Sequence, residues 1–237
     1  MRDASGRTLA DLDPFAIFDT EAARLDAYFA TLDEEGWARP SRCRGWSVRD
    51  VLAHLAGEEL YNHACLDDEL EELFARLERE GVTGGYDAFN DWCVRRRRGL
   101  PVEQVLAEWR EKNAETRRRM RELGRDALLP TSVGPYPVGL QTFHYDSEYA
   151  THADDVGAPV AEEEREARLH WRTRVGMFAL AERGAAVRVE SSDGGVLVRG
   201  AGHEVLLSPQ MFVEATVGRL PAGAVPAELA AVLRVLA

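Results

Sequence analysis

Apolar residues recur at three- and four-residue spacing in four long stretches between residues 14 and 156, and this repeat limits most strongly what the chain can fold into. Such spacing places the apolar side chains along one face of a helix, where neighbouring helices can bury them. Four amphipathic helices in succession, with one long connection, predict a four-helix bundle. Metal sites in such bundles are built from side chains that point inward from facing helices.

Residues typical of helix ends set the expected limits of these helices. We expect helices over residues 14–35, 47–80, 86–121 (with a break at 99–101) and 140–156. Ser47 is a typical N-cap residue, and Asp50 three positions later completes an approximate capping box. Trp46 and Trp109 are predicted to be core residues, because large aromatic side chains at helical spacing are usually buried.

The pattern changes after Pro159. We expect a helix over 162–183, strands over 186–190, 195–199 and 204–207, a helix from 208, and a last helix over 226–236. Short turns rich in Gly, Ser and Asp separate the strands, which predicts an antiparallel β-meander. Ser208 followed by Pro209 is typical of a helix start. The sequence therefore predicts a mainly α protein, with a helical bundle over residues 1–158 and a small α+β domain over residues 159–237.

Charge and composition exclude several classes of function. The chain has 237 residues, and 41 acidic against 29 basic residues give it a net charge of −12. Nucleic acids and anionic membranes repel such a chain, so we expect neither as a partner. We also expect a cytoplasmic protein, because there is no apolar run long enough for a membrane span and no apolar N-terminal core. The three widely spaced cysteines predict reduced thiols rather than disulfides.

One pair of residues in the fourth stretch points to chemistry. Glu148 and His152 are four positions apart, so on a helix they share one face, one turn above the other. That spacing lets a carboxylate and an imidazole bind one divalent metal. His54, in the second stretch, is a further candidate ligand. Three protein ligands with an open fourth position are typical of catalytic rather than structural zinc sites.

His144 makes the choice of pair ambiguous, because it also lies four residues from Glu148. At 1.5 Å per residue, His144 and His152 are about 12 Å apart along the helix axis. That is too far for both to bind one ion whose ligands lie about 2 Å away. From spacing alone, either His144 or His152 could bind with Glu148.

Two motifs resemble those of a known family. GWSVRDVLAHLAGEE (residues 45–59) resembles the second-helix signature of the DinB-like, mycothiol-dependent maleylpyruvate isomerase family, and SEYATHADDVGAP (residues 147–159) resembles its fourth-helix signature. The resemblance implies a DinB-like bundle, a sterol-carrier-like C-terminal domain, and a metal held by His54, Glu148 and His152. His144 is then a residue that lines the pocket or a substitute ligand.

The resemblance also suggests roles for two further residues. Arg219, in Val217-Gly-Arg219, resembles a Gly-Arg pair that the family places at the end of a C-terminal-domain helix facing the active site, where it would bind substrate. Asp155 is expected to orient a ligand imidazole or to be only a charge near a helix end. The family also uses an arginine from the bundle domain on its substrate, and no residue of this chain matches it by position.

The resemblance therefore implies a metal-dependent enzyme that uses a thiol. The expected cofactors are a divalent metal, with zinc expected from the type of ligands, and mycothiol as the thiol cosubstrate. The expected partner is a small electrophilic substrate. Addition and later departure of the thiolate would give isomerisation, and retention would give S-transfer. Two alternatives remain: a zinc-water hydrolase on the same fold, and a non-catalytic metal-binding module. The sequence leaves the electrophile and the oligomeric state open.

Overall fold

The computed structural model describes residues 7–236, which divide into two compact units. The bundle unit comprises Pro14–Thr142 and His152–Pro159. The sheet unit comprises Phe143–Thr151 together with residues 7–13 and 160–236. Helix α8 (Val138–Val156) therefore contributes residues to both units.

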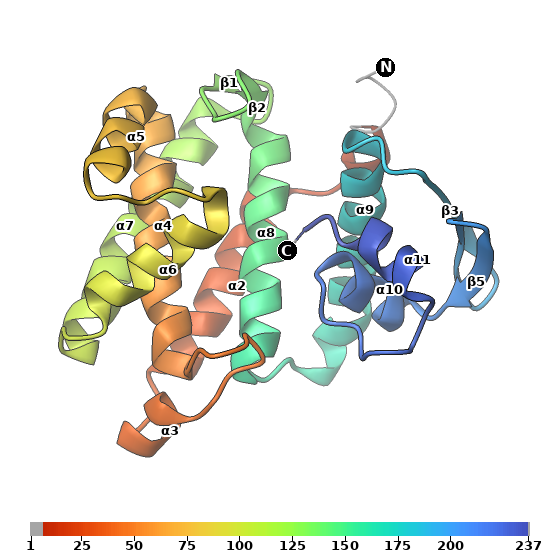
Figure 1. Ribbon diagram of the computed structural model, residues 1–237, viewed down its shortest axis with the longest axis horizontal. Coiled ribbons are helices and arrows are strands. Elements are labelled where there is room, and N and C mark those ends of the chain that lie inside the picture. The colour runs from red at the N-terminus through yellow and green to blue at the C-terminus, as the bar shows by residue number, and fades with distance from the viewer. Residues whose placement is uncertain (1–6, 237) are drawn as a thin grey trace. The chain divides into compact units, whose positions relative to one another are not determined.

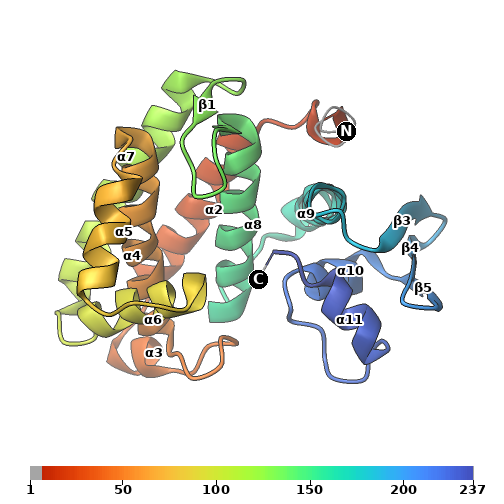
Figure 2. The ribbon, with the colours of Figure 1, turned by 45° about the horizontal axis from the view of Figure 1, so that its top comes forward.

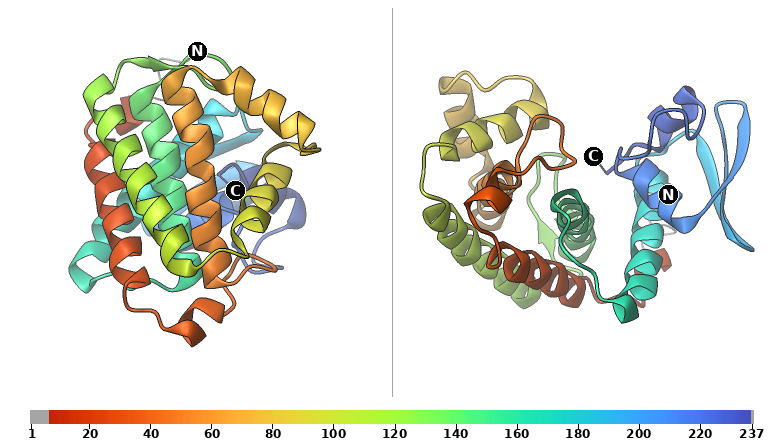
Figure 3. Two further views of the ribbon diagram at one scale, coloured as in Figure 1. Left: turned by 90° about the vertical axis from the view of Figure 1, so that its left-hand side faces the viewer. Right: turned by 90° about the horizontal axis from the view of Figure 1, so that it is seen from below.

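The bundle unit is almost entirely helical (Figure 1). Its other elements are α2 (Pro14–Phe29), α3 (Glu34–Ala38), α4 (Val48–Asp67), α5 (Leu70–Arg79), α6 (Gly85–Arg97), α7 (Val102–Leu123), and the short strands β1 (Leu128–Leu129) and β2 (Tyr136–Pro137). Helices α2, α4, α7 and α8 form the predicted four-helix bundle, and the left view of Figure 3 shows the long helices side by side. No helix among residues 7–236 is long and apolar enough to span a membrane.

Aromatic side chains fill the bundle core. Trp109 of α7 is 2% exposed, as predicted, and meets Phe29 of α2 edge to face, with ring centroids 5.7 Å apart. Phe29 also packs against Trp37 of α3, at 5.3 Å. Such pairs add about 0.5–1.5 kcal/mol beyond the area they bury. They fix α2, α3 and α7 against one another.

The contact between α4 and α6 is close enough to require a glycine. A Cβ atom at Gly57 would lie 2.3 Å from Cys93 Cβ and 2.7 Å from its Sγ. We expect Gly57→Ala to destabilise the protein by about 2 kcal/mol, because overpacking outweighs the better helix propensity of alanine. The midpoint of denaturant unfolding measures this. Gly99→Ala is the control, since nothing lies within 4 Å of a Cβ there; equal midpoints for both variants would contradict the close contact.

Two expected helices are shorter than predicted. The first was expected to reach residue 35, but α2 ends at Phe29 and α3 begins anew after Asp33, whose side chain accepts a hydrogen bond from Gly36 N at 2.8 Å. The second was expected to reach residue 80, but α4 ends at Asp67, where Asp68 takes a left-handed conformation (φ 59°). Both aspartates act as caps, because short polar side chains hydrogen-bond locally and tolerate left-handed backbone.

The start of α4 is confirmed as predicted. Ser47 Oγ accepts a hydrogen bond from Asp50 N at 3.2 Å, and Asp50 Oδ2 accepts one from Ser47 N at 3.0 Å. Burial alone would raise the pKa of Asp50, but hydrogen bonds from the Arg98 guanidinium and from Ser47 hold it below its ordinary value. The capping box is therefore charged at neutral pH, and it sets the register of the helix that carries His54.

The sheet unit has a small α+β core around a three-stranded sheet. Its elements, besides the middle of α8, are the 3-10 helix η1 (Arg7–Leu9), α9 (Glu162–Glu182), β3 (Val187–Ser192), β4 (Gly195–Gly200), β5 (His203–Leu207), α10 (Pro209–Thr216) and α11 (Ala227–Leu233). The strands are antiparallel in the order β3-β4-β5, which confirms the predicted meander (Figure 2). Ser208 caps α10 by accepting from Met211 N at 3.2 Å, also as predicted. The last helix is shorter than the expected 226–236.

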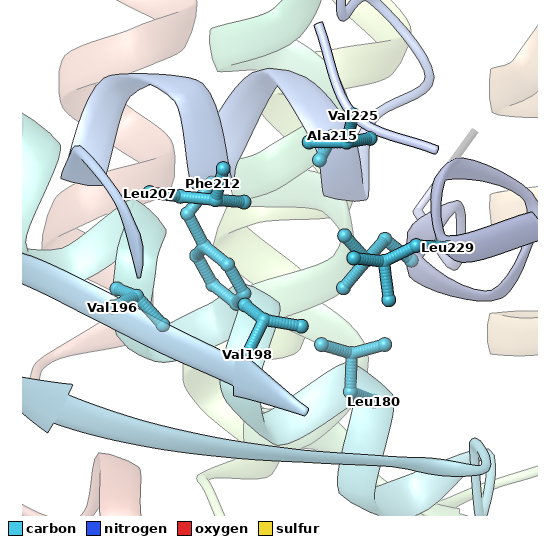
Figure 4. Close-up of a cluster of buried hydrophobic side chains, with 9 residues drawn as sticks. Leu180, Val196, Val198, Leu207, Phe212, Ala215, Val225 and Leu229 are labelled. Carbon is cyan, nitrogen blue, oxygen red and sulfur yellow. The ribbon is translucent and has the colours of Figure 1, made fainter. Parts of the chain in front are cut away.

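One apolar cluster joins the sheet to the helices of this unit (Figure 4). Its buried members come from α9, β4, β5, α10, α11 and the segment between the last two helices: Leu180, Val196, Val198, Leu207, Phe212, Ala215, Val225, Leu229 and Leu233. Phe212 is fully buried, and Figure 4 shows its ring between the strand residues Val196 and Val198 and helix α10. Alternation along β4 points Val196 and Val198 to the same face of the sheet. This face is the core of the sheet unit.

Candidate metal centre

Two histidines meet inside the bundle unit. His54 lies in the second turn of α4, and His152 lies near the end of α8. They are 2% and 6% exposed, and their ring centroids are 4.8 Å apart at an angle of 71°. Neutral imidazole is the commonest metal ligand in proteins, so two rings this close together can offer nitrogens to one ion.

Glu148 completes a set of three metal-type donors. One ligand atom each from His54, Glu148 and His152 all lie within 4.8 Å of one another. Zinc holds nitrogen and oxygen ligands at about 2.0–2.2 Å, so ligand atoms on one ion are about 3–4 Å apart. Small side-chain rotations would close the set around an ion. Two imidazoles and one carboxylate are also a donor set found in catalytic zinc sites.

Asp155 and Cys43 lie next to Nδ1 of the His152 ring. His152 Nδ1 is 3.2 Å from Asp155 Oδ2, and Cys43 Sγ donates to the same oxygen at 3.1 Å. Cys43 Sγ is also 3.6 Å from His152 Nδ1. These three buried residues form a second group of metal-type ligands. Sequence reasoning proposed Asp155 for this position but missed Cys43.

The surroundings of His54 also include residues that the sequence did not indicate. The Trp46 ring lies 5.2 Å from the His54 ring, and Trp46 is only half-buried, so its predicted place in the core is wrong. Glu58 Oε2 is 3.9 Å from His54 Nε2. Glu58 follows His54 by four residues, the same spacing that separates Glu148 and His152. This spacing could have indicated from the sequence that Glu58 lies next to His54.

His144 belongs to neither ligand group among the described residues. It lies on α8 with its Nε2 3.0 Å from Glu182 Oε2 on α9, and its ring is 5.8 Å from that of Phe178. Both partners belong to the sheet unit. Its role as a pocket-lining residue or substitute ligand stays a prediction.

Arg219 follows the end of α10, where the resemblance placed it. Its amide donates to Glu214 O at 2.8 Å and its Nη1 to Val217 O at 3.3 Å, around Gly218 with φ 67°. Glycine adopts this left-handed conformation at the least cost, so Gly218 suits the turn that ends α10 just before Arg219. The role of Arg219 toward a substrate stays a prediction.

All three cysteines are free and buried, in agreement with the prediction of reduced thiols. Burial raises the pKa of Cys65 to about 11 and that of Cys93 to about 12, so both remain protonated at neutral pH. A buried, protonated thiol is a poor nucleophile. Neither Cys65 nor Cys93 is therefore a candidate for the reacting sulfur.

Comparisons with known proteins place the chain in a family. Residues 18–157 match the family model of the mycothiol maleylpyruvate isomerase N-terminal domain, a span that includes all three candidate ligands. Two crystal structures, of the mycothiol-dependent maleylpyruvate isomerase and of a histidine-to-alanine mutant of it, share the fold with TM-scores of 0.64 and 0.63. The identities are 15% and 14%, over 90% of this chain and 93% of theirs. No curated protein matches. Because the family model covers more than half of its length, the chain belongs to the mycothiol maleylpyruvate isomerase N-terminal domain family.

Proposed function

We propose that this protein is a metal-dependent enzyme that uses mycothiol to isomerise, or to transfer sulfur to, a small electrophilic substrate. The observation that carries the proposal is the convergence of His54, Glu148 and His152 within 4.8 Å, in a chain of this family. The two solved relatives are named as mycothiol-dependent maleylpyruvate isomerase, which supports a thiol-dependent isomerase here.

The donor set fits a divalent ion, for which zinc is the best candidate. His54 and His152 would each offer one neutral ring nitrogen, and Glu148 would supply the only negative charge among the three ligands. When bound, such an ion stabilises a thiolate and so supplies a sulfur nucleophile at neutral pH. With three protein ligands, one position stays open for the thiol.

The chain's remaining task is to bind the electrophile. We assign Arg219 to a carboxylate of the substrate, because a guanidinium pairs with a carboxylate through two parallel hydrogen bonds. The thiolate sulfur would bond to one carbon of a conjugated carbon–carbon double bond, and the π electrons of that bond would move to the conjugated carbonyl to give an enolate, which then either expels the thiolate or takes up a proton on carbon. If the carbon–sulfur bond breaks again after rotation of the substrate, the product is an isomer and the thiol is recovered; if it persists, the product is a thioether.

Thiol binding is testable by spectroscopy on cobalt-substituted protein. We expect mycothiol to produce a sulfur-to-cobalt charge-transfer absorption, because thiolate coordination lowers the pKa of the thiol below its free value of about 8.5. The band should fade as the pH falls through the lowered pKa, since the protonated thiol no longer binds the ion. Arg219→Ala should keep the band but reduce turnover of a carboxylate substrate.

Two outcomes would contradict the proposal in different ways. If no thiol changes the cobalt spectrum while the protein still hydrolyses esters or amides, the thiol is not a cosubstrate and the enzyme is a hydrolase. If cobalt binds but neither thiol binding nor turnover follows, the fold serves as a metal-binding module. A band that disappears in Arg219→Ala would place this residue near the thiol instead of the substrate.

A further inference from the structure

A single short loop before α4 is held firmly against the end of α8. A β-bridge between Pro40 and Ser47 closes it, and Arg42 N donates to Asp155 O at 3.0 Å. Inside the loop, Ser41 N donates to Trp46 O at 3.0 Å and Ser41 Oγ accepts from Cys43 N at 3.1 Å. These bonds link the loop (residues 41–46) to both helices that carry the candidate histidine ligands.

The loop touches both histidines, each with a different side chain. Trp46 packs its ring against His54, and Cys43 reaches Asp155 and His152. Cys43 is 9% exposed, and Asp155 is 4% exposed, so water cannot easily replace the thiol as a hydrogen-bond donor. The Cys43 thiol has no metal-ligand role in the set of His54, Glu148 and His152, which leaves its contact with Asp155 unused by the proposed reaction.

We propose that Cys43 is a positioning residue, which acts through Asp155 to fix the His152 imidazole for metal binding; this rests on the metal site proposed above. Asp155 Oδ2 accepts from the Cys43 thiol at 3.1 Å and lies 3.2 Å from His152 Nδ1, so it can accept a hydrogen bond from that nitrogen when the nitrogen carries the proton. With its proton on Nδ1, the ring leaves Nε2 as the free donor nitrogen. The thiol bonds to the same carboxylate oxygen that faces the ring, and this bond keeps Oδ2 directed at His152 Nδ1.

The same three residues could instead bind a second ion. Their separations of 3.1, 3.2 and 3.6 Å suit either hydrogen bonds or ligands of one metal. Hydrogen bonding is favoured, because an ion on each side of His152 would require loss of both ring protons. Neutral imidazole keeps one of them at ordinary pH. A second bound ion is therefore an outcome that would overturn the proposal.

Zinc affinity, measured by competition with a chromophoric chelator, tests the role of Cys43. We expect Cys43→Ala to weaken zinc binding about tenfold and Asp155→Asn about tenfold to a hundredfold, the range found for groups that orient metal ligands. Cys43→Ser keeps a donor hydroxyl and should recover most of the affinity. Cys65→Ala is the matched control. It removes a different buried thiol, which lies on α4 and not in the loop, and it should leave the zinc affinity unchanged.

The double variant separates positioning from simple packing. If Cys43 acts through Asp155, adding Cys43→Ala to the Asp155→Asn variant should lower zinc affinity little further. If the two substitutions instead lower zinc affinity additively, Cys43 acts independently of Asp155 and the proposal is overturned. The metal-free protein gives a second readout. Long-range proton–nitrogen NMR should find His152 protonated on Nδ1 in the wild type and a mixture of tautomers in Cys43→Ala.

The outcomes distinguish this proposal from that of the proposed function. Wild-type affinity in Cys43→Ala, or loss of one of two bound zinc ions, overturns the positioning role and leaves the metal site intact. Failure of the wild type to bind any zinc or cobalt overturns the metal-dependent function. In that case the tautomer measurement still tests the positioning role of Cys43. An unchanged His152 tautomer in metal-free Cys43→Ala would exclude orientation of the ring by the thiol.

Discussion

His152→Ala is expected to empty the metal site. Structural zinc sites with four protein ligands bind zinc with an apparent free energy of about 10–16 kcal/mol, which is about 3 kcal/mol for each ligand. Loss of the His152 imidazole should therefore weaken metal binding by at least about a hundredfold. Purified wild-type protein should carry about one transition-metal ion per chain, and the variant almost none. Elemental analysis of protein purified without added metal measures both.

The control for this variant lies on the same helix. His144→Ala removes an imidazole that pairs with Glu182, so it should retain its metal. If His144→Ala alone emptied the site, the ligand pair would be His144 and Glu148, one turn away from the proposed register. Retention of a full equivalent of metal in a triple variant of His54, Glu148 and His152 would refute the site altogether.

Phe212→Ala is expected to destabilise the sheet unit by about 3–5 kcal/mol, the usual cost of removing a fully buried phenylalanine. Phe212 lies at the centre of the apolar cluster in Figure 4 and packs between the sheet and α10. Hydrogen exchange of the β4 amides measures the loss directly, and it should accelerate more than about a hundredfold.

Leu206→Ala is the control for the core variant. Leu206 lies on β5 next to the buried Leu207, but it is 53% exposed, so its removal should change exchange little. Equal acceleration in both variants would mean that the cluster is not the stabilising core of this unit.

The fold was largely predictable, because it depends on local patterns. Helical periodicity predicted the bundle, alternation with short turns predicted the meander, and Ser47 and Ser208 marked two helix starts correctly. The two errors in the bundle helices occurred at Asp33 and Asp68, where a single polar residue caps or ends a helix inside a pattern that otherwise continues. Apolar periodicity alone does not detect such a residue, because it follows only the spacing of apolar side chains.

The site was predictable only in part. Glu148 and His152 share a helix, so their spacing indicated that they lie close together, whereas the choice of His54 depended on the family motif. The contact of Cys43 with His152, 109 positions away in sequence, depends on how a loop packs against a distant helix. No local pattern encodes a contact between residues more than a hundred positions apart.

The loop over residues 41–46 has a consequence for how the protein can vary. Its length is fixed at both ends, by the bridge from Pro40 to Ser47 and by the bond from Arg42 to Asp155, and its side chains meet both histidines. An inserted residue would shift Cys43 or Trp46 out of register. The turn between β3 and β4 is different, since its residues Asp193 and Gly194 are exposed and nothing lies within 4 Å of a Cβ atom at Gly194. Insertions and deletions should therefore accumulate in that turn, and the loop before α4 should keep its length wherever the metal chemistry is retained.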